Sequence, residues 1–355
     1  MSKILVVGGA GYIGSHVVKA LQEAKHEVFI LDNFCLGHRE AAAVLGCTLD
    51  NGKLLEADLL KPDSLDTALQ ADGGGFDAVI HLAALSQVGE SMQQPLMYYE
   101  NNITGTLNLL KAMHQHGVKT FLFSSTAATY GNPNSSFTND GKIPESHPTE
   151  PINPYGRTKL AIEWLLKDCA KAWGLTATAL RYFNAAGNDA TAIIGELHRP
   201  ESHLIPYIMG ALYGRHQPDG TLMQFKIFGD DYATPDGTCI RDYIHVSDLA
   251  RAHVLAVERD IAEAGKQLSV YNVGTGRGFS VLEVVKGMEV ALGREIPYEM
   301  GDRRAGDPDM LVADPSRIMA DFGWKPERTT IDYISKDILK WTERLAAHSW
   351  NWPAN

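Results

Sequence analysis

Tyr155 and Lys159 are four positions apart, and in a helix that spacing places two side chains on one face. An ammonium group close to a phenol favours the phenolate, and so does the positive end of a helix. Asn153 and Pro154 are typical of a helix N-cap and first residue, so we expect Tyr155 in the first turn. A free tyrosine has a pKa of about 10, and lowering it to about 7 takes roughly 4 kcal/mol. The pair therefore predicts a tyrosine that acts as a base near neutral pH.

A glycine-rich turn near the N-terminus gives this pair its context. The apolar run 4–7 is typical of a strand buried on both faces of a parallel sheet, and a helical pattern follows the turn. Gly8, Gly11 and Gly14 lie between the two. Glycines there allow a tight turn and a close approach of the backbone to a pyrophosphate, whose charge then faces the helix N-terminus. The turn predicts a dinucleotide site.

Asp32 ends the second apolar run. A carboxylate in that position can bind the hydroxyls of the adenosine ribose and repels a 2'-phosphate, which favours NAD over NADP. His38 and Arg39 follow closely and are cations that could serve a phosphate instead. NAD is the expected cofactor.

Short apolar runs alternate with helical patterns through the first half of the chain. We expect strands over 4–7, 28–31, 53–57, 78–81, 120–123 and 176–180, and helices over 62–69, 95–116 and 154–173. This alternation predicts an α/β fold with a doubly wound, parallel, Rossmann-like sheet. Residues 1–183 are expected to form this NAD-binding domain. Residues 184–355 are expected to form mainly a smaller mixed α/β substrate lobe, with segments near 240–256 and 271–273 returning to the first domain.

Composition excludes several classes of protein. The 355 residues are 45% hydrophobic, with a formal net charge of -11, which argues against nucleic acid as a partner. No apolar run approaches the ~20 residues of a membrane span, and the N-terminus leaves no room for a signal peptide. We therefore expect a cytoplasmic protein without a membrane partner.

Cysteines and histidines give no metal pattern. The four cysteines are scattered without a C-x-x-C spacing, which is typical of free thiols in a reducing compartment. The thirteen histidines include no H-E-x-x-H, and His114 and His116 lie in a polar helical stretch typical of a surface. No metal is expected.

Several motifs, in order, resemble those of known enzymes. The glycine turn, 124–126, Tyr155 with Lys159, and 181–184 together resemble the extended short-chain dehydrogenase/reductases. Within them the chain is similar to the UDP-glucose 4-epimerases, also called UDP-galactose 4-epimerases. That similarity covers nearly the whole chain and includes the segments 88–91, 101–102, 241–246, 271–274 and 303–307.

The resemblance implies roles for individual residues. Tyr155 would remove the proton from the sugar 4-hydroxyl, Lys159 would lower its pKa and bind the nicotinamide ribose, and Thr126 would hydrogen-bond the same hydroxyl. Tightly bound NAD, regenerated in each cycle, would contact Gly8, Gly11, Tyr12, Ile13, Gly14, Asp32, Asn33, Asp58, Leu59, Leu82, Ala83, Ala84, Ser86, Asn101, Ser124, Tyr155, Lys159, Tyr182 and Phe183. A UDP-sugar would contact Thr126, Tyr155, Asn184, His203, Leu204, Lys226, Phe228, Arg241, Arg304, Asp307 and Leu311.

Two further implications concern binding and assembly. Arg241 and Arg304 suit a diphosphate, because a guanidinium forks onto phosphate oxygens. A homodimer through the helices near 95–116 and 154–173 is also implied.

The chain departs from the family pattern at four places. The segment 83–86 lacks a lysine that the best-known members carry against the cofactor, and Leu36 and Gly37 replace a polar pair. His203 stands where some members have a uridine-contacting asparagine. Leu311 stands where some have a tyrosine that limits room for an N-acetyl group. Leucine is intermediate in size, so it neither admits nor excludes N-acetylated sugars.

Ala127 and Ala128 limit the reactions that this site could catalyse. Related 4,6-dehydratases and decarboxylases carry an acidic residue after the Ser/Thr of the motif, because they need a second acid or base. Two alanines predict hydride transfer at one carbon only, hence 4-epimerisation of UDP-glucose and UDP-galactose through a 4-keto sugar. UDP-arabinose/UDP-xylose or UDP-N-acetylhexosamine epimerisation, and a dehydrogenase that releases NADH, stay open. A non-catalytic dinucleotide sensor would be expected to lack the tyrosine or the lysine.

Overall fold

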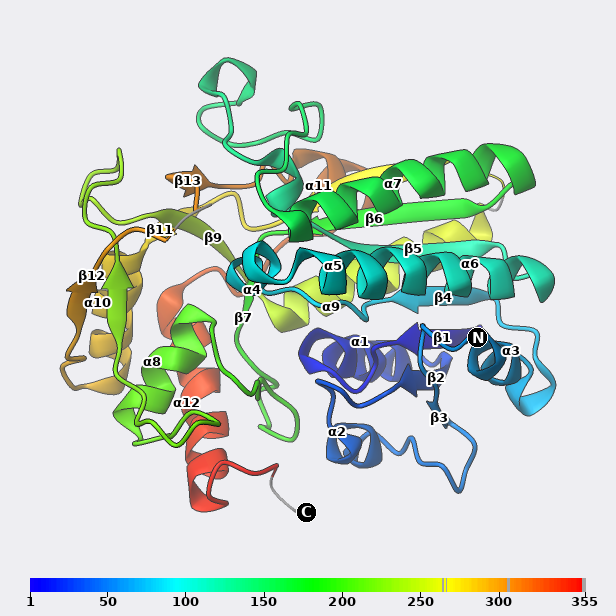
Figure 1. The fold of residues 1–355 in the computed structure, drawn as a ribbon, viewed down its shortest axis with the longest axis horizontal. Coiled ribbons are helices and arrows are strands. Elements are labelled where there is room, and N and C mark those ends of the chain that lie inside the picture. Colours follow the sequence, from blue (N-terminus) through cyan, green and yellow to red (C-terminus); the bar gives the residue numbers. More distant parts are fainter. Residues whose placement is uncertain (264, 266, 305–306, 353–355) are drawn as a thin grey trace.

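Seven parallel strands form the central sheet, in the order β3-β2-β1-β4-β5-β6-β10 (Figure 1). The computed structural model describes residues 1–263, 265, 267–304 and 307–352. The strands are β1 (Lys3–Val7), β2 (Glu27–Asp32), β3 (Leu54–Glu56), β4 (Ala78–His81), β5 (Thr120–Thr126), β6 (Thr176–Tyr182) and β10 (Ser269–Val273). The order and the parallel pairing confirm the expected doubly wound α/β fold.

Helices cover both faces of this sheet because its strands are apolar on both faces. Side chains alternate along a strand, so Ile4 and Val6 of β1 face one layer while Leu5 and Val7 face the other. The first layer contains α1 (Tyr12–Glu23) and α9 (Val246–Ala262), and the second contains α3 (Pro62–Leu69), α6 (Gly105–Gln115) and α7 (Pro154–Trp173). Both layers bury continuous apolar clusters against the sheet.

The prediction of a single α-helix over 95–116 is wrong for residues 99–104. α5 (Pro95–Tyr98) and α6 are joined by the π-helical turn η2 (Tyr99–Thr104). The buried Asn102 of this turn accepts a hydrogen bond from the amide of Leu85 at 2.9 Å and donates to the Leu85 carbonyl at 3.0 Å and to Thr158 Oγ1 at 3.1 Å. The turn therefore ties the loop after β4 to helix α7.

The second lobe is built from shorter elements. Its three-helix core contains α8 (Leu204–Leu212), α10 (Val281–Leu292) and α12 (Ile331–Ala347). Beside it lie a parallel pair, β8 (Lys226–Phe228) with β12 (Glu299–Gly301), and a small sheet of β7 (Asn184–Ala186), β9 (Ile240–His245), β11 (Gly278–Ser280) and β13 (Met310–Leu311). The remaining helical elements are α2 (Arg39–Val44), η1 (Ala71–Gly73), α4 (Val88–Gln93), η3 (Ala127–Tyr130), η4 (Ser135–Phe137) and α11 (Ser316–Phe322).

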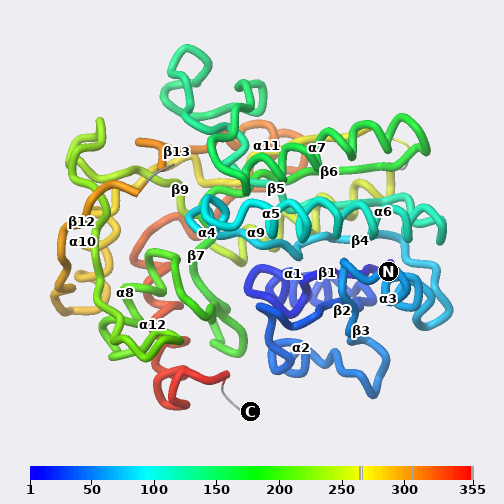
Figure 2. The backbone as a smooth tube through the Cα atoms, viewed as in Figure 1, coloured from blue at the N-terminus to red at the C-terminus, as the bar shows by residue number. Residues whose placement is uncertain are grey.

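The chain crosses between the lobes more than once. β10 and α9, from the second half of the sequence, belong to the central sheet and one of its helical layers. After β7 the chain runs between α1 and the helices α8 and α12 (Figure 2). A domain boundary at residue 183 stays a prediction.

Two expectations about the chain can be compared directly with the described residues. Cys35, Cys47, Cys169 and Cys239 all carry free thiols, as expected. Among the helices of the part described, none is long and apolar enough to cross a membrane.

Candidate active site

A cavity opens at the carboxyl-terminal edge of the central sheet, where ligands bind in open α/β folds. Its wall contains every expected cofactor residue except Phe183: Gly8, Gly11, Tyr12, Ile13, Gly14, Asp32, Asn33, Asp58, Leu59, Leu82, Ala83, Ala84, Ser86, Asn101, Ser124, Tyr155, Lys159 and Tyr182. Phe183 is buried instead in a small apolar cluster with Ala127, Tyr130 and Leu311. The wall also contains residues that the sequence did not predict as cofactor contacts: Val7, Leu31, Cys35, Leu36, Gly37, Ala57, Leu85, Ser125 and His198.

The glycine turn between β1 and α1 leaves no room for side chains. Gly8 has a φ of +81°, and a Cβ there would lie 2.6 Å from the amide nitrogen of Ala83. A Cβ on Gly14 would lie 2.0 Å from the Gly8 carbonyl oxygen. Gly11 offers no side-chain cap to α1, so the amides of its first turn face the cavity end of the sheet. This cradle suits a pyrophosphate at a helix N-terminus.

Asp32 is held in place by the backbone around it. Its carboxylate accepts hydrogen bonds from the amides of Ala10 at 3.0 Å and Phe34 at 2.9 Å. Burial raises the pKa of this carboxyl, and those amides oppose the rise. A Cβ on Gly37 would lie 2.9 Å from the carboxylate, so the departure from the family pattern at this position lets the loop fold closely over Asp32.

The two basic residues that follow Asp32 are already engaged elsewhere. His38 is hydrogen-bonded through Nε2 to the carbonyl of Leu197 at 2.8 Å, and Arg39 donates to Glu56 at 2.6 Å. Neither residue therefore offers a free cation for the 2'-phosphate of NADP, and the wall around Asp32 fits NAD.

Tyr155 lies in the first turn of α7, as expected. Asn153 caps the helix by accepting from the amide of Gly156 at 2.8 Å. Thr126, at the end of β5, lies close enough to the Tyr155 phenol to lower its pKa. The structure thus brings together the proposed base and the hydroxyl expected to share its substrate.

Lys159 lies in the cavity wall with Tyr155, and its ammonium is directed at Ser124. The ammonium donates to the Ser124 carbonyl at 2.7 Å and to Ser124 Oγ at 3.2 Å, and lies 6.0 Å from the centre of the Tyr155 ring. Burial raises the pKa of Tyr155 to about 12, which the nearby Thr126 hydroxyl only partly offsets. Burial lowers the pKa of Lys159 to about 7. In the protein alone the Lys159 ammonium donates to Ser124, and its role in lowering the pKa of Tyr155 stays a prediction.

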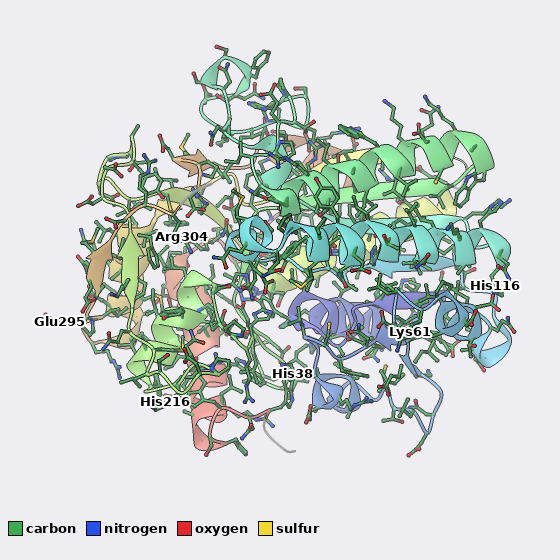
Figure 3. All side chains as sticks on the ribbon, in the orientation of Figure 1. His38, Lys61, His116, His216, Glu295 and Arg304 are labelled. Carbon is green, nitrogen blue, oxygen red and sulfur yellow. The ribbon has the colours of Figure 1, made fainter. Side chains whose placement is uncertain are left out.

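Cationic side chains expected at the substrate gather on the second lobe. Arg241 of β9 lies 3.7 Å from Asp307, and Arg304 lies 3.1 Å from the other oxygen of the same carboxylate. Arg304 also lies over the ring of Phe228, at 5.2 Å from its centre, and Figure 3 labels it on this lobe. Two guanidinium groups thus share one carboxylate, which leaves positive charge for a diphosphate.

The other expected substrate residues are spread around this group. Leu311 of β13 pairs with Arg241 of β9, while Lys226 is paired with Glu299 at 2.9 Å. Asn184 begins β7, which pairs with β9, and Leu204 begins α8. These positions, together with Thr126, Phe228, Arg304 and Asp307, lie outside the cavity wall described above. Ala305 and Gly306 of the segment 303–307 lie outside the described residues.

His203 lies in the cavity wall but is directed at carboxylates. Its Nδ1 is 2.9 Å from Glu196 Oε1 and 3.4 Å from Glu201 Oε1. His198 faces the same two residues. Sequence reasoning singled out only His203 of these four, although the spacing E-x-H-x-x-E-x-H over 196–203 was available as a signal.

Comparison with known proteins gives a consistent result. The model of the NAD dependent epimerase/dehydratase family matches residues 4–274. A UDP-glucose 4-epimerase of Halalkalibacterium halodurans is 46% identical, over 98% of this chain and 95% of that protein. A crystal structure of a UDP-glucose-4-epimerase from Stenotrophomonas maltophila, with bound NAD and formylated UDP-arabinopyranose, is 38% identical with a TM-score of 0.87 and covers 98% of this chain and 100% of that one. The UDP-Glc/GlcNAc 4-epimerase of Campylobacter jejuni is 40% identical with a TM-score of 0.78, over 97% and 99% of the two chains.

Proposed function

The chain belongs to the NAD dependent epimerase/dehydratase family, and on that premise we propose that it is an NAD-dependent UDP-sugar 4-epimerase, an isomerase. One observation carries the proposal: Tyr155, close to Thr126, lies in the wall of a cavity shaped for a dinucleotide. The residues that follow Thr126 are Ala127 and Ala128, whose side chains can neither donate nor accept a proton. Tyr155 is therefore the acid–base group that we assign to the reacting carbon, which suits a reversible reaction at one carbon.

The residues of this chain act on the proton and on the position of the sugar. Tyr155 takes the proton from the sugar 4-hydroxyl, and Thr126 orients that hydroxyl. When bound, NAD+ supplies a reversible hydride acceptor and a positively charged ring, and positive charge favours a phenolate. Arg241 and Arg304 hold the diphosphate, so the 4-keto sugar turns within the site without leaving it. Tyr155 then returns the proton on the other face.

UDP-glucose and UDP-galactose are the proposed substrate pair. A relative named UDP-glucose 4-epimerase, 46% identical, supports this choice. Leu311 is buried against Ala127 and Phe183 beside the catalytic strand end, and its intermediate size neither admits nor excludes an N-acetyl group. UDP-N-acetylhexosamines and UDP-arabinose/UDP-xylose are the alternative substrates, and a dehydrogenase that releases NADH is the alternative reaction.

The proposal is tested with the purified protein and no added cofactor. Incubation with UDP-galactose, followed by chromatography of the products, is expected to give UDP-glucose with no net NADH at 340 nm. UDP-N-acetylgalactosamine and UDP-arabinose, tested in parallel, measure the tolerance of the pocket. Stoichiometric accumulation of NADH, or product formation only with added NAD, would point to the dehydrogenase instead.

We also propose that the protein is a homodimer that assembles through α4, α5 and α7. α4 and α5 pack against α7, and this face exposes Met92, Leu96 and Trp164, with Leu96 83% and Trp164 61% exposed. Large apolar side chains gathered on one face are typical of an interface. Sedimentation velocity is expected to give twice the 38.8 kDa chain mass, and Trp164→Glu is expected to give the monomer. A wild-type monomer would contradict this assembly.

A cytoplasmic location stays a prediction.

A further inference from the structure

Four side chains converge beside the dinucleotide cavity, on the segment between β7 and α8. Glu196 Oε1 lies 3.1 Å from His198 Nδ1 and 2.9 Å from His203 Nδ1. Glu201 approaches the same two nitrogen atoms at 3.8 Å and 3.4 Å. One ligand atom from each residue lies within 4.8 Å of the other three. We call these residues the Glu/His cluster.

Two buried atoms of this cluster are left without a hydrogen bond. Glu201 Oε2, on a side chain that is 0% exposed, has no hydrogen-bond partner among the described residues, and neither has His198 Nδ1. The two atoms face each other across 3.8 Å, which is too long for a hydrogen bond. Leaving a buried carboxylate oxygen unpaired is costly, so a missing partner between them is the natural explanation.

We propose that the Glu/His cluster binds one divalent transition-metal ion of the Zn²⁺ type. An ion bonded at about 2.1 Å to each ligand allows ligand atoms up to about 4.2 Å apart. The 3.8 Å between Glu201 and His198 is within this limit, and the set as a whole, whose ligand atoms lie within 4.8 Å of one another, closes on an ion with a small side-chain shift. Two imidazole nitrogens and two carboxylate oxygens are a borderline donor set that suits Zn²⁺ better than Mg²⁺ or Ca²⁺, which take oxygen ligands.

The charges around the cluster also suit a cation. Glu196 and Glu201 bring two negative charges, and the guanidinium of Arg215 lies 3.8 Å from Glu201. Arg215 also donates to the carbonyl of His198, so its charge is shared with the backbone. Arg215 offsets one of the two carboxylate charges, and a divalent ion would displace the proton that His203 shares with the other.

The surrounding contacts give the ion a structural role. Trp341 of α12 donates to the Glu196 carbonyl at 2.8 Å, while His38 bonds the Leu197 carbonyl. The segment is thus held from the second lobe on one side and from the dinucleotide domain on the other, where Figure 3 labels His38. His198 and His203 are at the same time part of the cavity wall. The ion would fix this wall and would take no part in the chemistry at Tyr155.

The test measures metal binding directly, without reference to sugar turnover. The full chain is treated with a chelator, exchanged into metal-free buffer, and titrated with Zn²⁺ alone, with Mg²⁺ as comparison. We expect about one zinc per chain by mass spectrometry of the gel-filtered protein, and a higher Tm with zinc but not with magnesium. Failure of epimerase activity would leave this result unaffected.

Matched variants assign the ion to the cluster. Glu201→Gln keeps the shape of the side chain but is a poor ligand, and is expected to weaken zinc binding at least about 100-fold. His203→Gln, at a half-exposed position, is the second variant in case the first does not fold. His216→Gln alters an exposed histidine of the second lobe (Figure 3) and is expected to bind zinc as the wild type does. Absence of zinc from the wild type, or unchanged zinc binding in both cluster variants, would overturn the proposal.

Discussion

Tyr155→Phe is expected to lower kcat for UDP-galactose by about three orders of magnitude or more while leaving the fold intact. Positioned acid–base groups contribute about 10²–10⁴ in rate, and Tyr155 must both remove and return the proton in each cycle. Thr126 is the hydroxyl near Tyr155, and an aliphatic hydroxyl of this kind is too weak a base to take over the proton transfer. The phenyl ring fills the same space, so packing around the first turn of α7 is kept.

The measurement is steady-state turnover, with thermal unfolding and NAD content measured on the same sample. Tyr298→Phe, on an exposed tyrosine of the second lobe, is the matched control and is expected to keep wild-type turnover. Activity of Tyr155→Phe within tenfold of the wild type would mean that another group transfers the proton.

Glu163→Ala is expected to cost about 3–5 kcal/mol of stability, because it leaves a buried arginine without its partner. Glu163 of α7 accepts from Arg181 Nε at 2.9 Å and from Nη2 at 2.6 Å, and also from Ser125 Oγ at 2.5 Å. The two charged side chains are only 4% and 6% exposed. This ion pair fixes the catalytic helix to β6, beside the strand β5 that ends at Thr126, so its loss is also expected to lower turnover.

Urea unfolding measures the loss. Replacing both partners, as in Glu163→Leu with Arg181→Met, is expected to be less damaging than Glu163→Ala, because no buried charge is left unpaired. Asp332→Ala breaks the exposed pair with Lys336, and is expected to change stability by less than about 1 kcal/mol. A loss below about 1 kcal/mol in Glu163→Ala itself would contradict the assigned role.

Local pattern was enough to predict the central sheet. The apolar runs ending at Val7, Asp32 and His81 are strands within a residue of the expected bounds, because a strand buried on both faces must be apolar throughout. β5 extends three residues beyond the expected end at Phe123, to Thr126. Its polar end is tolerated because Ser124 and Ser125 bond Lys159 and Glu163, which lie far along the chain.

Features that depend on contacts between residues far apart along the chain could not be predicted from the sequence. The π-helical turn at Asn102 interrupts an otherwise helical pattern, and its side chain bonds Leu85 and Thr158. The short strand β13 pairs with β9, roughly seventy residues earlier in the chain. A strand of only two residues is too short to show the side-chain alternation from which strands are predicted.

The candidate site was predictable in its members but not in its electrostatics. The spacing of Tyr155 and Lys159 placed them on one helix, while the direction of the lysine depends on Ser124 in β5. The segment that carries Glu196 and Glu201 is a loop, so its sequence shows neither a helical nor a strand periodicity. Only the fold brings them to His198 and His203.

The position of β10 at the edge of the central sheet has a consequence for synthesis of the protein on the ribosome. β10 pairs with β6, although roughly ninety residues separate the two strands. At about 5–20 residues per second, the backbone of β6 is therefore left as an open sheet edge for several seconds or more during translation. α9, which covers one face of the same sheet, is also translated only after β6. The N-terminal half is then an aggregation-prone nascent chain, and a chaperone that shields this edge is expected to raise the yield of folded protein.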